Sequence, residues 1–97
     1  MPGYILLQKF TPKALADLKA SPGRVEGAKT AAQKMGIKVI GVWRTMGQYD
    51  AVTVVDAPND EAASLLALAS ASTGNVTTET MRAYSEEEWK ALVGKLP

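Results

Sequence analysis

The chain has 97 residues, 46% of them hydrophobic and 22% charged, which is typical of one globular domain and not of a disordered chain. Eleven Lys and Arg residues balance ten Asp and Glu residues, so the net charge of +1 provides no basic surface for a nucleic acid. The chain contains no cysteine and no histidine, which excludes disulfides, the usual zinc sites, haem ligation by histidine and Ser-His-Asp or cysteine catalysis. We therefore expect no metal and no cofactor.

The N-terminal residues do not resemble a signal peptide. The apolar stretch has no basic flank, and Gln8 and Lys9 end it too early. No segment approaches the roughly 20 apolar residues of a membrane span. We expect a cytoplasmic protein without a membrane partner, and we interpret residues 1–97 as a single domain.

Residues 4–10 are short, apolar and rich in β-favouring types, which predicts a first strand. Thr11 and Pro12 follow it in the order of an N-cap and a first helical residue, because proline lacks the N–H that would be unpaired there. Leu15 and Leu18 then lie on one face of the predicted helix.

A break in this helical segment is predicted at Ser21 and Pro22, which repeat the cap-then-proline order. A second helical stretch follows, and Gly36 is placed to end it in a left-handed conformation. We interpret residues 12–35 as one helical layer with a break. The apolar positions of its second part recur every three or four residues: Val25, Ala28, Ala32 and Met35.

Two strands joined by a hairpin are predicted next, over residues 37–45 and 49–56, because Val, Ile, Trp, Tyr and Thr are concentrated there. Met46-Gly47-Gln48 is short enough for the turn, in which Gly47 most simply supplies a backbone conformation that other residues disfavour. These strands should pair antiparallel.

The next helix begins near Pro58, where a capping amide and two acidic residues favour a helix N-terminus. Gly74 is placed to end it. The predicted buried stripe consists of Ala62, Leu65, Leu66 and Ala69.

Residues 75–84 predict the last strand, with Val76, Thr78, Thr80 and Arg82 alternating against Thr77, Glu79, Met81 and Ala83. Ser85 and Glu88 then have the spacing of a capping box, which predicts a C-terminal helix. We expect this helix to dock through its apolar side chains: Trp89, Leu92, Val93 and Leu96.

This order predicts an α+β fold, a ferredoxin-like βαββαβ unit with a four-stranded antiparallel sheet and an extra C-terminal helix. Both main helices should cover one face of the sheet. The strands also carry Tyr4, Trp43, Tyr49 and Val55, and so much apolar area is unfavourable in water. We therefore expect a second copy of the chain to cover the other face.

Four ordered segments resemble the GYD-domain family, small proteins named for a Gly, Tyr, Asp motif. Here the motif is Gly47-Gln48-Tyr49-Asp50, with one residue inserted after the glycine. The similarity extends over residues 21–26, 45–50, 56–62 and 74–80. The resemblance implies a ferredoxin-like fold paired sheet to sheet as a dimeric α/β barrel. It also implies a largely unassigned role, and it brings no catalytic residues.

The candidate binding residues begin with Trp43, Arg44 and Arg82, because an indole and two guanidinium groups can bind a carboxylate or phosphate. The structural alternative is that the arginines pair with Glu79 or Asp50 across strands or across the dimer, which we favour.

Tyr49 and Asp50 are the other candidates. They are adjacent on a predicted strand, so their side chains should point to opposite faces and cannot act on one substrate atom. The structural interpretation, which we favour, packs the Tyr49 ring with its hydroxyl bonded and bonds Asp50 to N–H groups of the turn.

Three functions remain open from the sequence. The first, which we favour, is a non-catalytic small-molecule-binding or regulatory module that works as a homo-oligomer, a dimer or larger. The second is a cofactor-free enzyme of the monooxygenase or isomerase kind, with a cavity between paired sheets and with Tyr49, Arg44, Arg82 and Glu79 as its acid, base and anion-binding groups. The third is a structural subunit of a larger assembly.

Overall fold

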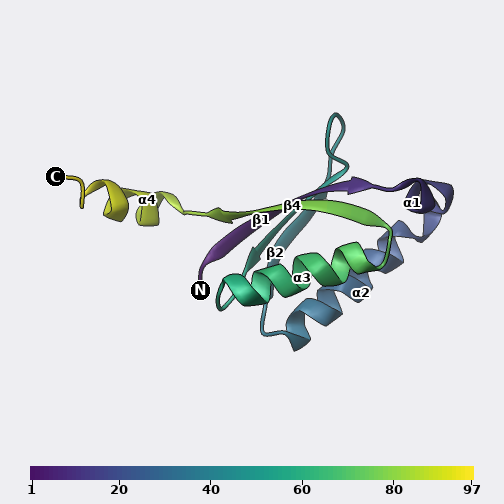
Figure 1. Ribbon diagram of the computed structural model, residues 1–97, viewed down its shortest axis with the longest axis horizontal. Coiled ribbons are helices and arrows are strands. Elements are labelled where there is room, and N and C mark those ends of the chain that lie inside the picture. Colours follow the sequence, from purple (N-terminus) through teal and green to yellow (C-terminus); the bar gives the residue numbers. More distant parts are fainter.

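A computed structural model describes all residues, 1–97, and gives the predicted α+β, ferredoxin-like arrangement. The strands pair antiparallel in the order β2-β3-β1-β4. The helices α2 and α3 lie side by side on one face of this sheet (Figure 1). In chain order the elements are β1 (Gly3–Phe10), α1 (Pro12–Ala16), η1 (Leu18–Ala20), α2 (Ser21–Lys34), β2 (Lys38–Arg44), β3 (Ala51–Asp56), α3 (Asp60–Ser72), β4 (Val76–Ala83) and α4 (Glu86–Val93).

Two of the three predicted caps before the main helices are confirmed. The Thr11 hydroxyl accepts a hydrogen bond from the Ala14 N–H at 3.3 Å, and Asn59 caps α3 through its side chain. The predicted cap at Ser21 is wrong, because Ser21 is itself helical, with φ −58° and ψ −39°. The 3₁₀ turn η1 runs directly into α2, so no extended residue is left there to cap the helix.

The predicted hairpin is confirmed, but its connection is longer than expected and spans residues 45–50. The Thr45 N–H donates to the Asp50 carbonyl at 3.0 Å, and the Thr45 hydroxyl donates to the Tyr49 carbonyl at 2.6 Å. Gly47 has a φ of +101°, and an added Cβ would meet nothing within 4 Å. The glycine is therefore needed for its backbone conformation and not for space.

The core lies between the sheet and the helices at the end of the sheet where β1 begins. The hydroxyl of the buried Tyr4 donates to the carboxylate of Asp60, and this hydrogen bond, followed by burial, raises the pKa of Tyr4. The hydroxyl of the buried Tyr4 is thereby satisfied by a hydrogen bond. The core consists of Tyr4, Leu6, Ala32, Ile37, Val55, Ala57, Ala63 and Leu66.

The buried face of α3 differs from the prediction. Leu66 is buried in α3, but Leu65 is 51% exposed and Ala69 is exposed, and the buried position beside Leu66 is Ala63. Because α3 carries alanine and leucine nearly all round, its periodicity cannot select the inner face. In the first helical segment the buried residue is Ala14, while Leu15 and Leu18 are exposed.

The helix α4 extends beyond the sheet at the end of β4 (Figure 1). Every residue of α4 is exposed, so the apolar side chains expected to dock this helix are not buried against the rest of the chain. This extension contributes to the elongated dimensions of the molecule, 52 × 31 × 18 Å. None of the helices is both long enough and apolar enough to cross a lipid bilayer.

Candidate functional site

The sheet face opposite α2 and α3 carries rows of apolar side chains. Tyr4 and Leu6 point to the buried face, so the intervening residues of β1 point to the open one. The strand register aligns them across the sheet in two rows, Gly41–Val54–Ile5–Met81 and Trp43–Val52–Leu7–Glu79. This open face contains Trp43 but not Tyr4 or Val55, which lie in the core.

Trp43 covers Gly41 on the open face. A Cβ added at Gly41 would lie 2.5 Å from the Trp43 Cη2 atom, so the indole ring rests on the space left by the missing side chain. The tryptophan is still 54% exposed. A flat, half-exposed indole in a row of apolar residues is typical of a contact surface.

A polar cluster borders these rows. The Tyr49 hydroxyl donates to Glu79 Oε2 at 2.6 Å, and Lys9 Nζ lies 5.5 Å from the centre of the Tyr49 ring. The hydrogen bond to Glu79 is the main cause of a raised pKa of Tyr49. The phenol therefore stays protonated and serves as a donor, which does not favour a role as a general base.

Asp50 and Arg44 have structural partners. Asp50 Oδ2 accepts a hydrogen bond from the Phe10 N–H at 2.8 Å, which ties the hairpin to the end of β1 and not, as expected, to the turn itself. Arg44 donates to the Ser21 carbonyl at 3.3 Å and lies 5.5 Å from the Phe10 ring. Arg44 forms no ion pair with an acidic side chain of its own chain.

Arg82 connects β4 to α4. Its guanidinium donates to the carbonyls of Gly3 and Ala83 and to Glu88 Oε2, the last at 3.0 Å, and it stacks on the Tyr84 ring at 4.3 Å. Within the chain Arg82 thus forms an ion pair with Glu88 and not with the expected Glu79 or Asp50.

Glu88 also completes the capping box with Ser85, as predicted. The hydrogen bond from the Ser85 N–H, followed by that from Arg82, lowers the pKa of Glu88. The pair with Glu88 in turn raises the pKa of Arg82. The Glu88 carboxylate is therefore charged near neutral pH, and its bonds to Ser85 and Arg82 fix the start of α4 relative to the sheet.

The six sequence candidates do not form one site. Trp43, Tyr49 and Glu79 lie on the open face. Arg44 and Arg82 lie on the helix-covered face, at opposite ends of the sheet, because they align with Ala51 and Tyr4 respectively. Sequence reasoning did not foresee the connection of Arg82 to α4, since the capping box alone already explained Glu88.

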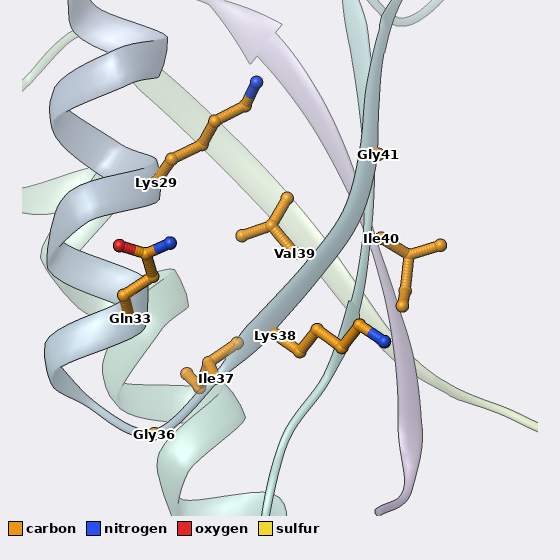
Figure 2. Close-up of a pocket in the computed structure, with 8 residues that line it drawn as sticks. All are labelled: Lys29, Gln33, Gly36, Ile37, Lys38, Val39, Ile40 and Gly41. Carbon is orange, nitrogen blue, oxygen red and sulfur yellow. The ribbon is translucent and has the colours of Figure 1, made fainter.

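A groove of about 440 Å³ runs along the outer edge of β2 (Figure 2). Lys29 and Gln33 of α2 line it, and Lys29 extends toward β2, whose free edge ends the sheet. A register irregularity between Val39 and Gly41 and the exposed Lys38 are features that protect edge strands from pairing. The groove therefore has a structural explanation.

Comparison with known proteins finds a matching family and a similar protein. The model of the GYD domain matches residues 4–93. A protein of Thermus thermophilus named "Glutamine synthetase and cystathionine beta-lyase binding protein" is 30% identical over 84 residues, which cover 86% of this chain and 88% of that protein. No solved structure matches the chain significantly.

Proposed function

Because this chain belongs to the GYD domain family, we propose that it is a non-catalytic regulatory module that binds other proteins, and that α4 is its binding element. The observation that carries the proposal is the placement of α4. This helix is capped, held in a fixed direction and wholly exposed.

An isolated helix of this length is unstable in water unless other groups support it. At its first turn the capping box and Arg82 provide such support. Beyond that turn the apolar side chains of α4 and of the residues after it are exposed: Trp89, Leu92, Val93 and Leu96. The spacing of these residues is that of an amphipathic helix that binds in the groove of a partner protein.

The relative supports the class of partner. Its name states that it binds glutamine synthetase and cystathionine β-lyase, and it is similar to this chain over most of both lengths. We propose one of these two enzymes, from the same organism, as the partner of this chain. Such a partner implies a cytoplasmic location.

The open face of the sheet is separate from α4 and has a different function. We propose that two copies pair through it as in dimeric α/β barrels, with residues 1–97 acting as one domain. The exposed Trp43 and the aligned Val52, Leu7, Val54 and Ile5 supply the apolar area. In this arrangement Tyr49 and Glu79 form a polar border.

The raised pKa of Tyr49 argues against this tyrosine as the base of a cofactor-free enzyme on this face, because the phenol is held protonated by its hydrogen bond to Glu79. The arginines that such an enzyme would use lie on the other face.

Titration of the chain with purified glutamine synthetase and cystathionine β-lyase of its host tests the proposal. We expect binding to one of them, and Trp89→Ala should weaken it about 30-fold, the effect of removing a tryptophan hot spot. The matched control is Leu68→Ala on α3, which removes another exposed apolar side chain and should leave the affinity unchanged. Binding to neither enzyme, or equal binding of the Trp89→Ala variant, would overturn the proposal.

A further inference from the structure

The space between the sheet and the helices is filled at one end and hollow at the other. The core occupies the end where β1 begins, around Tyr4, Val55 and Ile37. At the opposite end, near Phe10 and the hairpin, the same layers border a cavity of about 400 Å³ that is partly open to solvent. This volume is within the range of small-molecule sites, ~300–1,000 Å³.

Three small, exposed residues of α2 border this cavity. They are Gly27, Ala28 and Ala31, and a Cβ added at Gly27 would meet nothing within 4 Å. The side chains of these three residues are too short to fill the space beside the sheet. Larger apolar residues of the sheet and of α3 form the remaining walls, among them Leu6, Phe10, Val39, Val42, Leu66 and Val76.

The charges that line the cavity are all positive. Arg24, Lys29 and Arg44 contribute to the lining, and no Asp or Glu does. The chain as a whole has nearly equal numbers of acidic and basic residues, so this local excess of positive charge is not a consequence of composition.

The two arginines have unused hydrogen-bond donors. Arg24 donates through Nη1 to the Asp17 carbonyl at 3.1 Å, while its Nη2 atom is buried and has no hydrogen-bond partner within the chain. Arg44 donates to the carbonyl of Ser21. Neither arginine forms an ion pair, whereas Lys29 pairs with Glu26, with 3.6 Å between Lys29 Nζ and Glu26 Oε1. The two guanidiniums bond to the backbone carbonyls on either side of η1, Asp17 before it and Ser21 after it, so both lie near the N-terminal end of α2.

We propose that this cavity binds a small amphipathic anion, with its apolar part against the sheet and its carboxylate or phosphate on Arg24 and Arg44. Guanidinium groups favour these head groups because their parallel donors match two oxygens at once. The site is on the face of the sheet opposite the proposed pairing surface. It therefore does not depend on the proposed function.

Octanoate, octyl phosphate and octan-1-ol are suitable probes, since they share a chain and differ in the head group. In calorimetric titrations we expect saturable binding of one anion per chain, at least tenfold tighter than that of the alcohol. Arg24→Gln combined with Arg44→Gln should remove this preference. The comparison of octanoate with octyl phosphate identifies the head group that the site prefers.

Gly27→Leu should fill the cavity and abolish binding of the anions. Gly23→Leu is the matched control, because Gly23 also has open space around it but does not line the cavity. Circular dichroism would show that both variants are folded. The proposal is overturned if neither anion binds saturably at millimolar concentration, if the alcohol binds as tightly, or if both glycine variants bind like the unmodified chain.

Discussion

Replacement of Trp43 by alanine tests whether the open sheet face joins two copies of the chain. Trp43 leaves 54% of its surface exposed. For an aromatic side chain that buries up to about 250 Å², this is roughly 135 Å², which at about 25 cal/mol per Å² corresponds to about 3 kcal/mol in each copy. Both copies of a symmetric pair lose this contribution, so the dissociation constant should rise at least about a hundredfold.

Sedimentation velocity over a range of concentrations measures this constant. Trp89→Ala is the matched control, because Trp89 is also 54% exposed but lies on α4, so its removal should leave the pairing unchanged. The reasoning is refuted if the unmodified chain is a monomer throughout the range. It is also refuted if Trp43→Ala associates as tightly as the unmodified chain, or if Trp89→Ala dissociates instead.

Three further predictions concern stability. In chemical denaturation, Gly36→Ala should destabilise the fold by about 1–2 kcal/mol, because the φ of residue 36 is +75°, in the left-handed region. Gly27→Ala, inside α2, should instead stabilise the fold by about 0.5–1 kcal/mol. Equal effects of the two substitutions on stability would contradict the argument from backbone conformation. Leu66→Ala should cost about 2–5 kcal/mol as a core truncation, and a loss below about 1 kcal/mol would contradict its placement in the core. The pKa of Glu88 is lowered in the folded chain. The ionised carboxylate therefore contributes fully to stability above its ordinary pKa of 4.5, and this contribution to stability is lost as the pH falls below that value. Trp89 fluorescence should therefore change in acid, and Glu88→Gln should remove that transition; an unchanged transition would contradict the role of this carboxylate.

The order of elements could be predicted from the sequence because its signals are local. Thr11 with Pro12, Asn59, Ser85 with Glu88, and Gly36 each act within a few residues, and each lies at the helix end that it was expected to mark. Strand alternation in residues 76–83 was also sufficient to divide the two faces of β4.

The buried face of α3 could not be predicted in the same way. Leu65 and Leu66 are adjacent and equally apolar, so only the packing of the helix on the sheet decides that Leu66 is inside. Ser21 shows the same limit, since its cap signal was overridden by the helical turn that precedes it.

The candidate residues were recognised by their chemistry, but their partners are long-range. Tyr49 finds Glu79 and Asp50 finds Phe10 across separate strands, and the sequence contains no local sign of either pair. The cavity has a local sign in the sequence. The small residues Gly27, Ala28 and Ala31 of α2 border it and cannot fill the space beside the sheet.

The central claim, that α4 binds a partner protein, is tested most directly by the affinity of the full chain for the candidate partner enzymes, measured in parallel for the unmodified chain and for Trp89→Ala. We predict saturable binding of the unmodified chain to one enzyme and about 30-fold weaker binding of the variant. Equal affinities, or no binding by the unmodified chain, would contradict the claim.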